Sequence, residues 1–379
     1  MKKVALVSVH NDPNFGSALQ AYALAYAIQR EGYECEYLNY TLGPAPNSIK
    51  SRIKKAAKSV LYKSGILSEP KTENSFWRTP EFKVQRELFK TFHDKRIPFS
   101  SKVYGPNTIK EANKDYDCFI VGSDQTWSPY VTKSKHTINF LDFVEPGRIK
   151  ASYAPSLGTC HLEAEYIELL KEKLSGFNYL SCREKHNADL LSERFGRKVE
   201  HVLDPTLLLS REEWLMIAEP VDMPEHYILC YILGAKQCIS DFAERIGKEQ
   251  SLPVYYIGSR PEYLLKENAL NDITPGQFIT LISQADYVVT DSFHGSLFSI
   301  NFQRQFYAFT KREITDGTND NDRIRDFLTV LDISERLKED YDYRQDLPID
   351  YAMYDDRLKE LSLSSMSYLS KLLKSYIVT

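Results

Sequence analysis

The sequence has few cysteines, and none of them is spaced as in a metal-binding or redox motif. Its six cysteines stand apart from one another, without a CxxC pair, at positions 35, 118, 160, 182, 230 and 238. Histidine-based metal patterns, such as HxxE or a closely spaced pair, are missing too, and the acidic stretch DGTNDND lacks the regular spacing of a calcium loop. We therefore expect free, mostly buried thiols in a reducing cytoplasm, and an activity that needs neither a metal nor a cofactor.

Long apolar runs and an excess of positive charge are also missing. No run approaches the roughly 18 to 20 apolar residues of a membrane-spanning helix, and the apolar part of the opening MKKVALVSVHND is too short for a secretory signal. The formal net charge of −4 gives no sign of nucleic-acid binding. With 42% hydrophobic and 26% charged residues the composition is that of an ordinary globular protein, and we expect a soluble one.

What the sequence does contain is a regular alternation of strand and helix patterns. Short apolar runs bounded by polar residues or glycine predict strands, and the longer runs between them predict helices. The predicted strands include VALVSV, YECEYLNY, CFIVGSDQ, KASYAP, YILCYILG, PVYYIGS, YVVT and QFYAF. Because such alternation is typical of parallel sheets covered by helices, we predict an α/β protein.

The pattern restarts near residues 215–225, which divides the chain into two units. A length of 379 residues is also long for a single core. We predict an N-terminal Rossmann-like domain over 1–212, a C-terminal Rossmann-like domain over 222–345, and a helical stretch over 350–379 that packs back on the first domain. The parallel sheets of the two domains would face one another across a cleft.

Polar residues and glycines gather where the predicted strands end. The stretches HNDPNFGS, GSDQTW, PSLG, CRE, LDP, IGSR and TDSFHG each follow an apolar strand. In open parallel sheets, ligands bind beyond the carboxyl ends of the strands. The first of these turns holds a single glycine, so it does not form the GxGxxG fingerprint of a dinucleotide site. These loops are the predicted lining of the cleft.

Two segments interrupt the alternation. The basic stretch 48–65 reads as an amphipathic helix, and two interpretations are open: a helix that lies on an anionic membrane surface, or a solvated helix that covers the first sheet. The second segment, 310–327, is rich in Asp, Asn and Gly. It reads as a loop that would form a mobile flap over the cleft.

Six of these motifs, taken in order, resemble the polysaccharide pyruvyl transferase family. They are NFGSALQAYAL, VGSDQTW, ASYAPSLG, SCRE, LDPTLLL and VVTDSFHGSLFSI, and they span both halves of the chain. The resemblance implies a fold similar to two-domain glycosyltransferases, with the acceptor on the N-terminal side and the donor on the C-terminal side. It also implies transfer of pyruvate from phosphoenolpyruvate to a saccharide of the cell envelope, as a cyclic ketal and often on a lipid-linked repeat unit.

Such a reaction needs groups that bind the anionic donor, a general acid and a general base. His294 is the main candidate for anion binding and proton donation, because it stands at the head of a predicted helix whose free N–H groups favour anions. Gly295 would let a phosphate approach the backbone. Family members often carry arginine where this chain has Ser292, so Ser292 would donate only a hydrogen bond. Asp291 is expected to cap the helix.

The missing arginine charge would have to come from elsewhere on the chain. Arg183 in SCRE matches a family arginine and suits bidentate binding of phosphate or carboxylate, although an ion pair with Glu184 is the alternative. Lys311 and Arg323, which follow the strand QFYAF, are the other predicted donor contacts.

Acceptor contacts are expected from the first half of the chain. Asp124 in GSDQTW is the candidate base toward a sugar hydroxyl, and Trp127 would either stack on a sugar or lie in the core. Gly16, Ser17 and Gln20 stand at the start of the first helix, where a hydroxyl or anion would bind. We interpret Asp204, followed by Pro205, as a residue that shapes a turn and takes no part in catalysis.

Two rival functions are compatible with the same sequence. A glycosyltransferase that uses a nucleotide sugar would share the architecture, although no acidic residue is obviously placed to bind a ribose. A non-catalytic glycan-binding protein that kept the fold is the other rival, and the serine at position 292 keeps it open.

Overall fold

The fold is known from a computed structural model, which describes residues 3–8, 13–41, 82–129, 137–258, 260–310, 322–339, 342 and 344–375. The basic stretch 48–65, Lys311 and residues 311–321 of the predicted flap lie outside the described residues. The rest of that flap, residues 322–327, is helical and not a loop, because its apolar side chains have the period of a helix and are buried.

The first sheet is parallel and five-stranded, in the order β3–β2–β1–β4–β5. Its strands are β1 (Lys3–Val7), β2 (Glu34–Tyr40), β3 (Phe99–Tyr104), β4 (Cys118–Val121) and β5 (Ile149–Ser152). The central strand β1 pairs with β2 and β4, and all four residues of β4 are buried. Such continuous apolar strands are expected where helices cover both faces of a sheet.

Helices and a small parallel pair of strands complete the N-terminal lobe, by which we mean the elements from β1 to η5. Asn14 begins α1 because its side chain accepts a hydrogen bond from the Ser17 amide. The pair β6–β7 continues beyond β5 through a bridge between Ala151 and Tyr179. The elements are α1 (Phe15–Arg30), α3 (Lys83–Arg96), η3 (Ile109–Lys114), η4 (Thr137–Phe140), α5 (Ala164–Leu174), β6 (Ser181–Cys182), α6 (Lys185–Phe195), β7 (Glu200–His201) and η5 (Pro205–Leu207).

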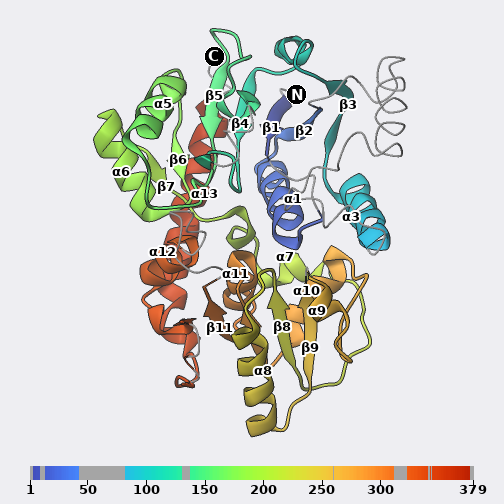
Figure 1. The fold of residues 1–379 in the computed structure, drawn as a ribbon. Coiled ribbons are helices and arrows are strands. Elements are labelled where there is room, and N and C mark those ends of the chain that lie inside the picture. The colour runs from blue at the N-terminus through green and yellow to red at the C-terminus, as the bar shows by residue number, and fades with distance from the viewer. Residues whose placement is uncertain are drawn as a thin grey trace, which may run out of the picture.

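The second sheet is also parallel and five-stranded, in the order β12–β11–β10–β8–β9. Its strands are β8 (Ile228–Ile232), β9 (Val254–Gly258), β10 (Tyr287–Thr290), β11 (Gln305–Phe309) and β12 (Leu337–Lys338). The helices of this C-terminal lobe are α7 (Arg211–Leu215), α8 (Gln237–Gln250), α9 (Pro261–Leu264), α10 (Pro275–Gln284), α11 (Phe293–Asn301), α12 (Asp322–Leu331) and η6 (Ser334–Arg336). Two parallel sheets, one in each lobe, confirm the predicted α/β class (Figure 1).

The end of the chain returns to the first lobe. After η7 (Tyr351–Met353), the long helix α13 (Asp355–Ser375) runs back beside β5. The Tyr368 hydroxyl donates to the Ser152 carbonyl, and the Ser365 hydroxyl accepts from the Leu203 amide. The red helix α13 therefore lies among the green elements of the N-terminal lobe in Figure 1.

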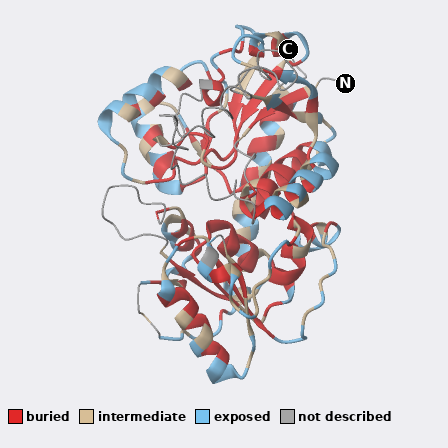
Figure 2. Ribbon diagram, turned by 45° about the vertical axis from the view of Figure 1, so that its right-hand side comes forward, coloured by how far each residue is buried: buried red, intermediate tan, exposed pale blue. Residues whose placement is uncertain are grey.

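The two lobes share one apolar core where α1 meets α10 and α11. Phe15 of α1 stacks on Phe278 of α10, with ring centroids 4.5 Å apart and an interplanar angle of 10°. Trp214 contacts Tyr22 on one side and Phe298 on the other. Figure 2 shows that buried residues run along the strands of both lobes and continue through the helices between them. The start of α1 is thus fixed against the C-terminal lobe by aromatic packing.

Helix α12 makes a second, polar connection between the lobes. The Asp326 carboxylate accepts from the amides of Lys185 and His186, at 2.7 and 3.0 Å, and these residues begin α6. One turn earlier, Asp322 accepts from the Cys160 amide at 2.9 Å. Two carboxylates of one helix in the C-terminal lobe therefore satisfy backbone donors of the N-terminal lobe.

The described residues include no helix with the length and apolar character that a membrane crossing requires. None of the six cysteines forms a disulfide bond, and five of them are buried.

Candidate active site

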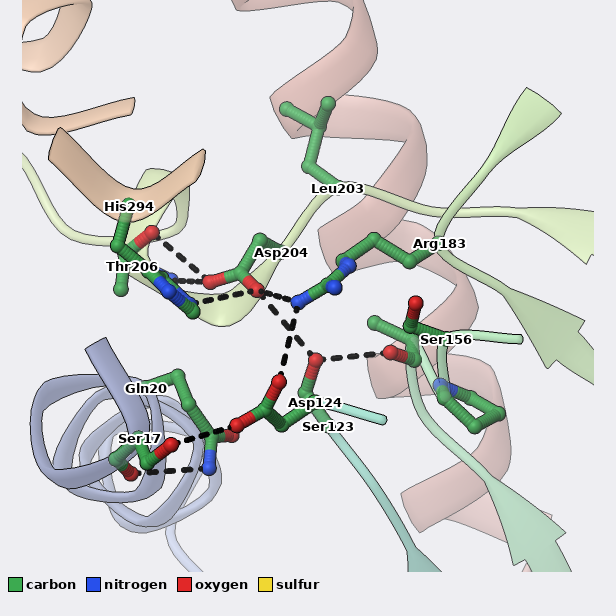
Figure 3. A network of polar contacts seen from close by, with 12 residues as sticks. Ser17, Gln20, Ser123, Asp124, Ser156, Arg183, Leu203, Asp204, Thr206 and His294 are labelled. Atoms are coloured by element: carbon green, nitrogen blue, oxygen red, sulfur yellow. Dashed lines mark hydrogen bonds and ion pairs between the residues drawn. The ribbon is translucent and has the colours of Figure 1, made fainter. Parts of the chain in front are cut away.

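Charged side chains from both lobes converge at the carboxyl ends of the strands. Asp124 follows β4, Arg183 follows β6 and Asp204 follows β7, while His294 stands in the first turn of α11, directly after β10. The four side chains form one network of polar contacts, drawn in Figure 3. Sequence reasoning placed three of these four in the site, and Asp204 is the one it left out.

Asp204 lies at the centre of the network and is almost completely buried. Its Oδ1 accepts from the amide and the hydroxyl of Thr206, at 3.0 and 2.8 Å, which makes it the cap of η5 as the turn interpretation predicted. Its Oδ2 faces the site, 2.8 Å from Arg183 Nη1 and 3.4 Å from His294 Nε2. Burial by itself would raise the pKa of Asp204, but His294 and Arg183 outweigh it and hold that pKa well below its usual range.

Arg183 is buried among acidic groups and still has donor capacity left. Besides the contact with Asp204, its Nε lies 3.4 Å from Glu184 Oε1 and its Nη1 lies 3.9 Å from Asp124 Oδ1. The predicted alternative of a Glu184 ion pair is therefore part of the arrangement. Its Nη2, however, is buried without a hydrogen-bond partner. An unsatisfied buried guanidinium nitrogen is rare, because leaving it so costs free energy.

His294 reaches the network from the C-terminal lobe and packs against Gly16 of the N-terminal lobe. A Cβ atom at Gly16 would lie 2.0 Å from His294 Nδ1, so the imidazole fills the space where any other residue has a side chain. The Nε2 atom is within ion-pair distance of Asp204 but makes no hydrogen bond in the protein. Gly16, which was predicted as an acceptor contact, thus has a clear structural role in seating the imidazole.

Asp124 and the start of α1 form the N-terminal side of the network. The Ser17 hydroxyl donates to Asp124 Oδ2 at 2.6 Å, and Gln20 Nε2 donates to the Ser17 carbonyl at 3.0 Å. Asp124 has a positive φ of 62°, a conformation that aspartate tolerates better than most residues. Gln20 Oε1 is buried without a partner. Three of the predicted N-terminal site residues therefore lie together.

A pocket opens next to the network, between the lobes. It is a small recess, partly open to solvent, and it is lined by Arg183, Glu184, Leu203, Asp204, Phe293, Leu297, Arg323, Asp326 and Phe327. The guanidinium carbon of Arg183 lies 4.3 Å from the centre of the Phe293 ring, and that of Arg323 lies 5.6 Å from it. Two predicted donor contacts, Arg183 and Arg323, thus meet around one ring in the same pocket.

The remaining predicted residues of the β10–α11 turn serve the local fold. Ser292 is the cap of α11, since its hydroxyl accepts from the Gly295 amide at 3.2 Å. The expectation that Asp291 caps this helix is wrong: its carboxylate accepts from the amides of Leu233 and Gly234, both at 2.7 Å. Gly295 lacks a side chain because Thr290 Oγ1 lies 2.7 Å from where its Cβ would be. Donor contacts by Ser292 and Gly295 stay a prediction.

Trp127 belongs to the core and not to the acceptor site. Its side chain has no exposed surface, its indole N–H donates to the Asn139 carbonyl at 3.1 Å, and its ring packs edge-on against Phe177. The prediction that Trp127 stacks on a sugar is therefore wrong, because the ring has no face open to a ligand. The sequence could not separate the two, since a buried and a ligand-facing tryptophan look alike in a strand-end loop.

The next question is whether the described part of the chain contains a cluster of side chains that could bind a metal ion. No group of three or more His, Cys, Asp or Glu side chains is placed there to hold a metal ion. The acidic residues near the site are held by Arg183, by Ser17 and by backbone amides instead.

Comparison with known proteins bears on what this network does. A profile of the family described as polysaccharide pyruvyl transferase matches residues 14–310, which is most of the chain and includes every residue of the network. The chain belongs to the polysaccharide pyruvyl transferase family. This confirms the resemblance carried by the six sequence motifs, and it makes a transferase acting on a polysaccharide or its precursor the function that the family indicates. No curated protein gave a significant match to the sequence.

Solved structures show a more distant likeness to this pyruvyl transferase family member. UDP-GlcNAc 2-epimerase from Neisseria meningitidis, bound to UDP-GlcNAc, has a TM-score of 0.49 and 12% identity, covering 99% of this chain and 100% of that one. The E. coli heptosyltransferase WaaC with ADP has a TM-score of 0.40 and 12% identity, covering 95% and 99%. At this level of likeness the arrangement of the sheets establishes the fold, and nothing about function is taken from these proteins.

Proposed function

We propose that this protein transfers pyruvate from phosphoenolpyruvate to two hydroxyls of a saccharide, forming a cyclic ketal and releasing phosphate. The observation that carries the proposal is Arg183 Nη2, a guanidinium nitrogen that is buried without a hydrogen-bond partner, with His294 close by on the same Asp204 carboxylate oxygen as Arg183 Nη1. Buried donors without partners fit a ligand with several anionic oxygens, and phosphoenolpyruvate carries both a phosphate and a carboxylate.

The donor would bind at the Arg183 side of the pocket. Arg183 offers Nη2, and Arg323 adds a second guanidinium on the same aromatic ring. The dipole of α11 favours an anion near the helix start, where Ser292 already caps the Gly295 amide. This arrangement supplies positive charge that position 292, a serine in this chain, does not.

The chemistry needs one proton to be delivered and two hydroxyl protons to be removed. In the proposed sequence His294 protonates the methylene carbon, and the central carbon then accepts the first sugar oxygen. The bond to the phosphate oxygen breaks, and a second sugar oxygen attacks to close the ring. Of the two hydroxyl protons, one replaces the proton that His294 gave and the other leaves with phosphate, so atoms and charge balance.

Asp124 is the proposed base for the attacking hydroxyl. Its carboxylate already accepts a hydrogen bond from the Ser17 hydroxyl at 2.6 Å, so a hydroxyl group can reach this carboxylate. Arg183 lies 3.9 Å away on its other oxygen. A sugar hydroxyl that replaced Ser17 at Asp124 would stand near the donor pocket, which is the relation that transfer requires.

The partners and conditions of the reaction follow from the family and the chain. The acceptor is proposed to be a cell-envelope saccharide, on a lipid-linked precursor where the family works at that stage. Six cysteines without a disulfide bond among them fit a reducing cytoplasm. Full activity in the presence of a strong chelator is expected, and activity that returns only with added divalent ions would contradict metal independence.

The direct test is phosphate release from phosphoenolpyruvate in the presence of candidate saccharides. Release that depends on the acceptor, with a pyruvate ketal in the product by mass spectrometry, supports the proposal. A thermal-shift titration comes first, because it needs no acceptor: phosphoenolpyruvate should raise the melting temperature at millimolar concentration, and a nucleotide sugar should not. A shift with UDP-GlcNAc alone would favour the glycosyltransferase instead.

A further inference from the structure

Asp204 stands between the guanidinium of Arg183 and the imidazole of His294, the two groups that the proposed donor site brings together. Its Oδ2 is shared by Arg183 Nη1 of the N-terminal lobe, at 2.8 Å, and His294 Nε2 of the C-terminal lobe, at 3.4 Å. In the described part of the chain, no other acidic side chain is recorded within ion-pair distance of His294. One carboxylate oxygen is therefore shared by side chains from both lobes.

The other half of the same carboxylate is held rigidly. Oδ1 accepts from both the amide and the hydroxyl of Thr206, at 3.0 and 2.8 Å. Pro205, which stands between Asp204 and Thr206 in the sequence, restricts the backbone of this turn. The side chain is almost completely buried, so water does not compete for these bonds. One oxygen therefore fixes the carboxylate and the other presents its charge at a defined point.

We propose that Asp204 is the positioning residue of the donor site, which sets the relative places of Arg183 and His294 so that both address one anionic ligand. The inference rests on the proposed function for the identity of that ligand. Asp204 does not touch the donor, because its Oδ2 is occupied by Arg183 Nη1 and His294 Nε2. It leaves Arg183 Nη2 as the donor that remains for the ligand.

The variant Asp204→Asn distinguishes a positioning role of Asp204 from the effect of its negative charge on the binding of an anion. The amide oxygen of asparagine can still accept from Thr206, so the turn is kept while the negative charge is lost. By charge alone, removing an anion from an anion site should strengthen the binding of phosphoenolpyruvate and of inorganic phosphate. If Asp204 positions Arg183 and His294, binding should instead weaken, by roughly ten- to hundredfold, since the charge-assisted bond to Arg183 is lost.

The experiment compares wild type, Asp204→Asn and Thr206→Val by calorimetric titration with phosphoenolpyruvate and with inorganic phosphate. Thr206→Val removes one of the two hydrogen bonds that fix Oδ1 and keeps the charge of the carboxylate, so it should weaken donor binding by less than Asp204→Asn does. In turnover assays Asp204→Asn should raise KM for the donor and lower kcat, with KM for the acceptor unchanged. Affinity in Asp204→Asn equal to or tighter than that of wild type would overturn the inference.

Two further results distinguish a failure of the proposed function from a failure of the positioning role of Asp204. If the wild type binds neither phosphoenolpyruvate nor phosphate, the proposed function fails, whatever Asp204 does. If Asp204→Asn does not fold, Asp204→Glu keeps the charge but displaces it by one methylene, and the same weakening is expected. A folded Asp204→Glu variant with wild-type donor affinity would also overturn the positioning role.

Discussion

Gly16→Ala tests whether the lobe contact at His294 is as tight as the structure indicates. Gly16 lies in the first turn of α1, where alanine is normally the better helix former by up to about 1 kcal/mol. Here the added Cβ would lie 2.0 Å from His294 Nδ1, whereas ordinary contacts begin near 3.4 Å. A displacement of about 1.4 Å is therefore needed before the methyl group fits.

The displacement falls on the imidazole and not on the helix. The neighbouring Phe15 is stacked on Phe278 at 4.5 Å, which fixes the start of α1 against the C-terminal lobe. Overpacking of this kind typically costs about 1 to 3 kcal/mol, which exceeds the gain in helix propensity. The His294 ring would also leave its place beside Asp204, and a misplacement on the order of 1 Å near a reacting centre lowers turnover by roughly a hundredfold.

The measurements are the melting temperature and its response to phosphoenolpyruvate. Gly16→Ala is expected to lower the melting temperature by a few degrees and to weaken the donor-induced shift. Gly176→Ala is the matched control, because a Cβ there meets nothing within 4 Å and its φ is not positive. If Gly16→Ala were as stable as wild type or more so, with an unchanged donor response, the reasoning about this contact would be refuted.

Three further predictions concern other parts of the site. His294→Gln should melt within a few degrees of wild type but lose roughly a hundredfold or more in acceptor-dependent phosphate release, as expected for a general acid; undiminished release would contradict its role. Asp326→Ala removes the acceptor for two amides at the start of α6. Like the loss of a helix cap, it should lower the free energy of unfolding by about 1 kcal/mol, measured by chemical unfolding. An unchanged free energy of unfolding would show that water replaces the carboxylate fully. The pKa of Asp204 is held below its ordinary value of about 3.9, so its stabilising effect is present above that pH and is lost as the pH falls toward the folded pKa. Asp204→Asn should therefore lose less melting temperature than wild type between pH 5 and pH 3, and parallel curves would contradict this.

Much of the architecture follows from the sequence by itself. Apolar strands such as Ile228–Ile232 alternate with helices because a parallel sheet must be covered on both faces, and this periodicity is written locally. The carboxyl ends of the strands are marked by polar residues, and this pattern by itself predicts a site that includes Asp124, Arg183 and His294. The family motifs are local as well, and the match over residues 14–310 confirms them.

Tertiary structure alone decided which of the marked residues act together. Asp204 follows a strand as the others do. The role of its Oδ2 atom, however, depends on Arg183 and His294, which approach this atom from different lobes. Trp127 was assigned to the core by neighbours such as Phe177 that its own loop does not contain. The absence of a side chain at Gly16 has meaning only beside the His294 ring. Local periodicity determines elements and their ends, whereas burial, ion pairing and close packing depend on atoms that the chain brings together only when both lobes have folded against each other.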